Sequence, residues 1–401
     1  MMSSSKIWTK DFSINCAICF FINLAYYMTM VIIADYTATV LHSSLAEAGL
    51  ACGVFILGSL FSRLFMGNSI EKIGLKRSLY IGLTIFLISS LINVFISTLY
   101  PLYIVRFLQG IGFGLTSSTT GVIMAHIVPP TRRGEGTSYY TMFVTLGTAV
   151  GPFAGLYLYQ NGSIQNNLLI GIVILIISLI GAYFLSVPKI EYTNTDDNHS
   201  FFSIQNFIEK TAVPMALVTF FVDLGFAAIL GFMASFAKES GLLEGSKYFF
   251  LIYAFFTVFS RPFTGRWFDS RGANTVMYPS FIIFALSLLL MSQSTTNWML
   301  LLAAVGVGLG FGTYMSCSQA IIISVAPLQR MGLATSTFFV FMDLSIGIGP
   351  FFLGYIVPFV HFRGMYMILA VVLVCCCVLY YFVHGRKCTM KEKEIKHQTQ
   401  N

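Results

Sequence analysis

Twelve apolar segments, each about 20 residues long, constrain the fold of this chain more than any other feature. This is the length of an α-helix that crosses a bilayer, and in lipid only helices or closed barrels satisfy every backbone hydrogen bond. Only 10% of the residues are charged, against about 25% in soluble domains, so the main solvent of this chain is lipid. We predict an all-α integral membrane protein with twelve transmembrane helices, at residues 12–38, 46–66, 77–97, 101–125, 137–159, 167–187, 211–236, 247–267, 274–293, 298–323, 332–357 and 364–384.

The second half of the chain repeats the first at an offset of 198 residues. FSRLFMGNSIEKIG at 61–74 matches FSRPFTGRWFDSRG at 259–272, and the match continues without a gap to Pro152 and Pro350. Such a parallel repeat predicts two pseudo-symmetric six-helix halves, with the substrate site near the bilayer midplane. The predicted parts are an N-terminal half at 1–188, a cytoplasmic linker at 189–210, a C-terminal half at 211–385 and a cytoplasmic tail at 386–401.

The basic residues predict the orientation of the chain. If the N-terminus is cytoplasmic, 19 of the 23 lysines and arginines lie in cytoplasmic segments, as the positive-inside rule requires. A shift of the span count by one would scramble this bias, so the bias supports an even number of spans and two cytoplasmic termini. The net charge of +7 is therefore a signal of membrane topology, and we expect no nucleic-acid partner.

GNSIEKIGLKR, from Gly67 to Arg77, resembles the signature that the major facilitator superfamily carries between its second and third spans. Glu71 stands where the family usually has Asp, whereas the second copy has Asp269. Glycines let a short loop turn tightly, and a carboxylate can cap a helix N-terminus or pair with an Arg. The resemblance implies that the two loops gate a transporter through Gly67, Glu71, Gly74, Arg77, Gly265, Asp269 and Gly272.

Two further motifs carry the same resemblance. LYIVRFLQGIGFG at 102–114 matches the family's fourth-span motif, and its Arg106 lies inside the span, where a charge is costly and indicates a function. The alternative is an Arg that snorkels to the outer surface. TLGTAVGPFAGLY at 145–157 resembles the fifth-span antiporter motif, which is associated with exporters, although Ser138 stands where the family often has a further Gly. The matching residues are Gly147, Gly151, Pro152 and Gly155. The alternative interpretation is that these small residues form an ordinary helix-packing face.

Three carboxylates interrupt apolar segments. Asp343 lies near the middle of the eleventh segment, Asp223 in the first part of the seventh, and Asp35 toward the outer end of the first. An intramembrane carboxylate is costly when charged, so each can carry a proton or hold a cationic group of a substrate. The repeat counterparts of Asp343, Asp223 and Arg106 are uncharged: Thr145, Asn23 and Ala304. We expect transport and proton coupling at Asp343, Asp223, Arg106 and Asp35.

Several classes of protein are disfavoured by what the sequence lacks. It has no Walker motif, no HExxH motif and no polar stretch long enough for a catalytic or sensor domain. Its eight cysteines show no metal-ligand spacing. We therefore expect no enzymatic activity, no cofactor and no metal. The expected partners are a small-molecule substrate, protons and the lipid bilayer, and the resemblance implies a monomer in a bacterial cell membrane.

The resemblance is strongest to bacterial twelve-span drug–proton antiporters. It implies a proton-coupled secondary transporter that exports a drug-like molecule or lipophilic cation across the plasma membrane by alternating access. Export of an endogenous zwitterionic metabolite such as a metallophore is the main alternative, because the chain has both Arg106 and several intramembrane acids. Uptake of a sugar or another metabolite is a weaker alternative.

Overall fold

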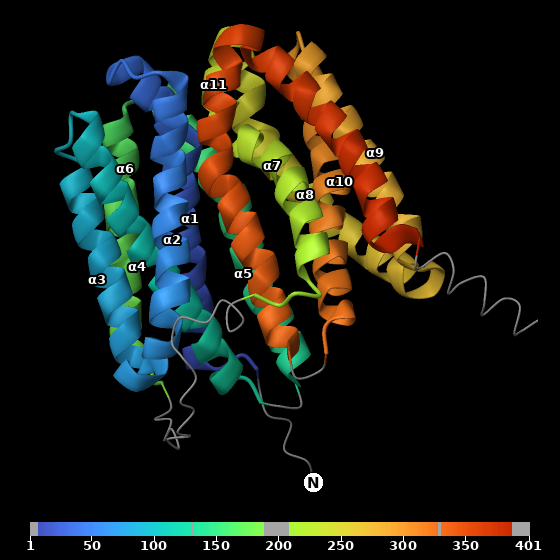
Figure 1. The fold of residues 1–401 in the computed structure, drawn as a ribbon. Helices are drawn as coiled ribbons and strands as arrows, with labels where there is room; N and C mark the ends of the chain where they lie inside the picture. The colour runs from blue at the N-terminus through green and yellow to red at the C-terminus, as the bar shows by residue number, and fades with distance from the viewer. Residues whose placement is uncertain (1–6, 130–131, 188–207, 328–329, 387–401) are drawn as a thin grey trace, which may run out of the picture. The chain divides into compact units, whose positions relative to one another are not determined.

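The computed structural model describes residues 7–129, 132–187, 208–327 and 330–386, and the regular structure in these ranges is helical (Figure 1). The chain divides into two compact units, Met1–Asp197 and Asn198–Asn401. The first contains α1 (Lys10–Val40), α2 (Leu45–Ile73), α3 (Leu75–Asn93), α4 (Leu99–Ile127), α5 (Arg133–Gln160) and α6 (Ile164–Phe184). The second contains α7 (Val213–Ser240), α8 (Leu243–Arg271), α9 (Ala273–Gln293), α10 (Asn297–Val325), α11 (Met331–Tyr380) and the short π-helix η4 (Tyr381–Gly385).

The helices confirm the predicted all-helical membrane fold. Each of the twelve predicted spans falls on a helix, but the last two share α11, whose backbone leaves the helical conformation at His361 (φ 58°, ψ 172°). Within the described residues, nine helices are long and apolar enough to cross a membrane, with α11 counted once and with α4 and α8 not among them. The number of twelve spans therefore stays a prediction.

Glycines let α4 pack closely against two neighbouring helices. A Cβ atom on Gly110 would overlap the carbonyl oxygen of Phe55 on α2, and one on Gly112 would lie 2.5 Å from the backbone nitrogen of Phe86 on α3. In α10 of the second unit, a Cβ atom on Gly310 would lie 2.6 Å from the backbone nitrogen of Phe284 on α9. Gly310 and Phe284 follow Gly112 and Phe86 by the repeat offset of 198 residues, so both units use the same close packing.

Aromatic clusters repeat as well. In the first unit the rings of Tyr26 and Phe113 lie 5.0 Å apart, and those of Tyr26 and Phe55 lie 4.6 Å apart. In the second unit the ring of Phe226 lies 4.5 Å from that of Phe311 and 5.3 Å from that of Tyr253. In each unit these rings come from the first, second and fourth helices. The three helices therefore pack against one another in the same way in both units.

The loop predicted between Gly67 and Arg77 is much shorter in the structure than the sequence indicated. Helix α2 continues to Ile73 and α3 starts at Leu75, so Gly74 alone separates them. Gly74 has φ +94° and Gly272, between α8 and α9, has φ +81°, a region that favours glycine. Gly67 and Gly265 lie inside helices, where helical hydrogen bonds replace the expected turn. The side chains of Glu71 and Asp269 lie outside the described residues, so their gating role stays a prediction.

Because α4 packs closely on α2, we expect one additional methyl group in this contact to destabilise the folded protein. We expect Gly110→Ala to lower the thermal unfolding temperature in detergent, because its Cβ would overlap the backbone of Phe55 and such overpacking costs about 1–3 kcal/mol. Gly171→Ala, in α6, is the matched control, since nothing lies within 4 Å of its Cβ position. Equal unfolding temperatures for the two variants would contradict this packing.

Candidate functional site

Arg106 is buried inside the N-terminal half. Its side chain is 1% exposed, its Nε donates to the carbonyl oxygen of Ala51 at 3.2 Å, and its Nη1 donates to Oε1 of Gln109 at 3.2 Å. The guanidinium also lies over the ring of Phe55, 4.7 Å from the centroid. No carboxylate among the described residues forms an ion pair with it. Arg106 therefore does not snorkel outward but joins α4 to α2.

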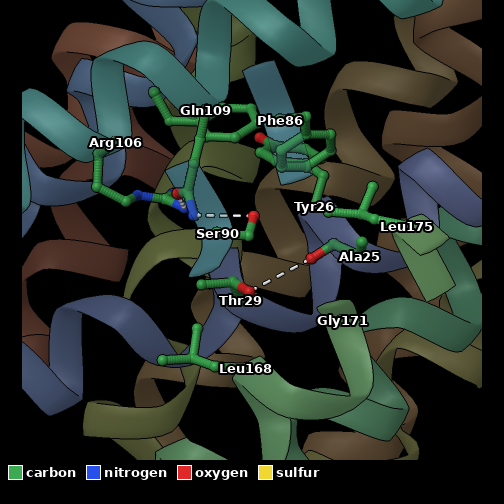
Figure 2. A pocket seen from close by; sticks show the side chains of 11 residues that line it. Ala25, Tyr26, Thr29, Phe86, Ser90, Arg106, Gln109, Leu168, Gly171 and Leu175 are labelled. Carbon is green, nitrogen blue, oxygen red and sulfur yellow. Dashed lines mark hydrogen bonds between the residues drawn. The ribbon is translucent and has the colours of Figure 1, made fainter. Parts of the chain in front are cut away.

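A small cavity lies beside Arg106, and Figure 2 shows its lining from close by. Nε2 of Gln109 donates to Oγ of Ser90 at 3.2 Å, so the polar network continues from α4 to α3. The cavity leaves about 10 Å³ for the centre of a water molecule, which is room for about one water. Its lining comprises Ala25, Tyr26, Thr29, Phe55, Phe86, Ser90, Arg106, Gln109, Leu168, Gly171 and Leu175. Arg106 thus faces a space of water size, smaller than an organic substrate needs.

Asp35 is also buried, toward the C-terminal end of α1. Its Oδ2 accepts a hydrogen bond of 2.9 Å from the hydroxyl group of Tyr159 on α5. Asp35 therefore links α1 to α5, and the structure gives it a packing role beside the predicted role in transport.

The antiporter-type motif lies where α5 packs against α1. A Cβ atom on Gly147 would lie 2.6 Å from Cβ of Asn23, and one on Gly151 would lie 2.6 Å from Cβ of Tyr27. Gly155 approaches the backbone of α1 still more closely, and Pro152 lies inside the helix. These small residues bring the two helices into backbone contact. A direct contact with substrate is not needed to explain them.

Asp223 and Asp343 lie on two helices of the C-terminal half that pack against each other, α7 and α11. The contacts of α11 lie on both sides of Asp223 along α7: Oγ of Ser345 donates to the carbonyl oxygen of Phe220 at 2.7 Å, and a Cβ on Gly349 would lie 2.8 Å from Cδ2 of Leu224. The sequence marked both acids but did not show that their helices are neighbours.

Asp223 has no hydrogen-bond partner among the described residues. Its side chain is 0% exposed, and neither carboxyl oxygen is bonded to any of them. Further along α7, the ring of Phe226 packs against that of Tyr253 from α8, with centroids 5.3 Å apart. The hydroxyl groups of Tyr314 and Thr219 lie 3.1 Å apart. An unpaired buried carboxylate is uncommon and points to a function.

Sequence reasoning missed Tyr253, Thr219 and Ser345. The sequence held a signal for two of the three. Thr219 precedes Asp223 by one helical turn and so shares its face. Tyr253 stands at the repeat position of Phe55, which adds a hydroxyl group to the C-terminal half where the N-terminal half has none.

An ion pair outside the membrane-spanning segments was also missed. Nη1 of Arg330 donates to Oε2 of the buried Glu209 at 3.1 Å, and the backbone nitrogen of Glu209 donates to Oγ1 of Thr337 at 2.8 Å. The hydrogen bond from Arg330, together with bonds from Thr211, holds the pKa of Glu209 below its usual range. The contact fixes the segment that enters α7 against the start of α11.

Comparisons with known proteins agree on one family. The sequence pattern of the Major Facilitator Superfamily matches residues 16–243 and 215–400. An uncharacterised MFS-type transporter of Methanocaldococcus jannaschii is 24% identical over 350 residues, which cover 85% of this chain and 89% of that protein. The staphylopine export protein of Staphylococcus aureus is 22% identical over 343 residues, or 81% of this chain and 84% of the relative.

Solved structures show the same fold. A bacterial homologue of the human lysosomal transporter Spinster, in an inward-facing and unoccupied conformation, matches with a TM-score of 0.78 and 14% identity over 97% of this chain and 99% of that one. The nucleoside transporter NupG matches with a TM-score of 0.72 and 15% identity, over 93% of this chain and 99% of its own.

The Glu209–Arg330 pair predicts a pH-dependent contribution to stability. Because the folded-state pKa of Glu209 is lowered, its stabilisation is present above the unfolded-state pKa, about 4.3 for Glu, and is lost as the pH falls through the folded-state value. We expect Glu209→Gln to unfold at a lower temperature than wild type at pH 7. The gap should close below about pH 4. A gap that is independent of pH would contradict an ionised Glu209.

Proposed function

The chain belongs to the major facilitator superfamily, and on this premise we propose that it is a proton-coupled secondary transporter. It exports a small organic molecule, drug-like or a lipophilic cation, across the cell membrane by alternating access. The observation that supports proton coupling is Asp223, a fully buried carboxyl group with neither oxygen bonded to any residue that the structure describes. A carboxyl group in such a position is suited to bind and release a proton during a cycle.

Two observations support export over uptake. The staphylopine export protein, by its name an exporter, covers 81% of this chain. The antiporter-type motif at Gly147, Gly151, Pro152 and Gly155 is the second, because the resemblance associates this motif with exporters. The riboflavin transporter RibZ of Clostridioides difficile is 22% identical over 72% of this chain. By their names, the two relatives therefore act on different organic molecules, staphylopine and riboflavin.

The proposed cycle uses the difference between the two halves. Residues that repeat, such as Gly112 and Gly310, pack the helices of each half in the same way. Residues that do not repeat carry the chemistry: Asp223 and Asp343 replace Asn23 and Thr145 of the first half. A proton from outside neutralises the acidic pair and favours the conformation that releases the substrate outward. Loss of that proton to the cytoplasm resets the transporter.

A zwitterionic metabolite is the second candidate substrate. The relative that exports staphylopine favours it, and the acidic pair offers a partner for an ammonium group. Arg106 contributes less to this candidate than the sequence implied, because its guanidinium is bonded within the N-terminal half and faces a water-sized space. A deletion strain separates the candidates: it becomes sensitive to drugs in the first case and retains a secreted metabolite in the second.

The proposal predicts transport that follows an imposed proton gradient. In inside-out vesicles, acidification of the lumen should drive uptake of the lipophilic cation tetraphenylphosphonium by the wild-type protein. The double variant Asp223→Asn with Asp343→Thr should lose this uptake, since it restores the uncharged pattern of the first half.

The matched control is Glu244→Gln, an acid of the same half with a side chain that is 71% exposed, and it should transport like the wild type. Uptake that ignored the gradient, or that survived in the double variant, would contradict proton coupling at the acidic pair. No uptake at all would contradict the lipophilic-cation class.

A further inference from the structure

We propose that a groove of the C-terminal unit binds one acyl chain of an anionic phospholipid, and that Lys210 and Arg386 hold its headgroup. The groove lies between α7 and the second part of α11, which follows the break at His361. Its volume of about 600 Å³ is in the range of pockets that hold organic ligands. The site concerns the membrane around the protein and does not rest on the proposed transport function.

The two helices that form the groove run antiparallel. The hydroxyl group of Tyr366 on α11 donates to the carbonyl oxygen of Ala228 on α7 at 3.5 Å. The rings of Phe232 and Phe362 lie 5.8 Å apart, so residue numbers rise along α7 as they fall along α11. The start of α7 is therefore level with the end of α11, where η4 also contacts α7.

The wall of the groove is apolar along its whole length. On α11 it includes Ile368, Val372, Cys375 and Leu379, which follow one another at intervals of three or four residues and so share one face of the helix. Phe221 forms the wall on α7. Because α11 is long and apolar enough to cross a membrane, this open face meets lipid chains rather than water.

Helix α6 of the N-terminal half is the counterpart of the second part of α11. The buried residues Leu168 and Leu175 of α6 recur at the repeat offset of 198 residues as the buried residues Tyr366 and Leu373 of α11. The two helices therefore turn corresponding positions toward the interior of their own halves, and their remaining positions can be compared directly.

The two halves differ in side-chain size at the middle of the groove. Ile174 and Ile177 of α6 correspond to Val372 and Cys375 of α11, so the C-terminal half has the smaller side chain at both positions. The fold accommodates isoleucine there in its other half. The groove is therefore a property of the sequence of this half and not a requirement of the fold.

The length of the groove matches the acyl chain of one leaflet. From Ile368 to Leu379 the helix rises about 16 Å at 1.5 Å per residue, and half of the hydrocarbon core of a bilayer is about 15 Å. A second transmembrane helix fits this wall less well. Close helix contact in lipid uses glycine, alanine, serine or threonine, and none of these lines the groove.

Two exposed basic side chains lie where α7 begins and α11 ends. Lys210 lies just before α7, and Arg386 directly follows η4. Arg386 is about 10 Å along the helix from Leu379, at the level of the headgroup of a lipid whose chain fills the groove. The neighbouring Glu209 is paired with Arg330, which offsets its charge. Basic groups beside transmembrane helices attract anionic headgroups, so the lipid is an anionic one.

Native mass spectrometry of the full-length protein, delipidated in detergent, tests the site. The probes are phosphatidylglycerol and phosphatidylcholine with the same acyl chains. We expect wild type to retain one lipid and to prefer phosphatidylglycerol about thirtyfold, from two basic side chains. Lys210→Gln with Arg386→Gln should lose the preference but still retain a lipid. Free glycerol phosphate, which has no acyl chain, should not displace the lipid.

The second variant fills the groove with the residues of the other half. Val372→Ile with Cys375→Ile should lose the retained lipid of either kind. Val374→Ile is the matched control, because Val374 is 57% exposed on the same helix but does not line the groove, and it should bind lipid like the wild type. The charge variant lies outside the predicted spans, so it tests the headgroup even if the filled variant does not fold.

Three results would overturn the proposal. Equal lipid retention by the filled variant and wild type would place the lipid elsewhere. Equal affinity of wild type for the two lipids, or displacement by glycerol phosphate alone, would remove the anionic phospholipid as the occupant. A dimer of wild type that the filled variant lacks would assign the groove to a second copy of the chain.

Discussion

The structure depends on one constraint, which is that lipid offers no hydrogen bonds to a polar group. Helices satisfy the backbone, and glycines such as Gly110 and Gly112 bring those helices into backbone contact without large side chains. The polar side chains obey the same constraint. Arg106 is held by Ala51 and Gln109, and its charge lies over an aromatic ring. Asp223 departs from this constraint, since neither of its carboxyl oxygens is bonded to a described residue.

The duplication shows which residues the fold does not require. The two halves share their packing glycines and their aromatic clusters at the same offset, so the fold does not need the residues in which they differ. Asp223 stands against Asn23, and Asp343 against Thr145. Asp223 lies on α7 and Asp343 on α11, and these two helices are in direct contact. These differences are why the proposed proton coupling is placed in the C-terminal half.

Hydropathy and repetition predicted the helices, their order and the packing that recurs within each half, because lipid and close packing act on local sequence. The loop around Gly67 was mispredicted, since a helix continues through it to Ile73, and glycine marks a turn only where φ is positive. Contacts between distant segments were invisible from the sequence. The hydrogen bond of Ser345 with Phe220 and the pair of Glu209 with Arg330 depend on how helices pack, which one sequence does not display.

The central claim is the proposal that the acids of the C-terminal half couple transport to protons. Its most direct test is the luminal pH of inside-out vesicles with an acidic lumen when tetraphenylphosphonium is added outside. The account predicts that the added substrate raises the luminal pH of wild-type vesicles, because each inward step of the substrate is paired with an outward proton, and that it leaves the luminal pH of Asp223→Asn vesicles unchanged. Equal changes in the two kinds of vesicle would contradict the claim.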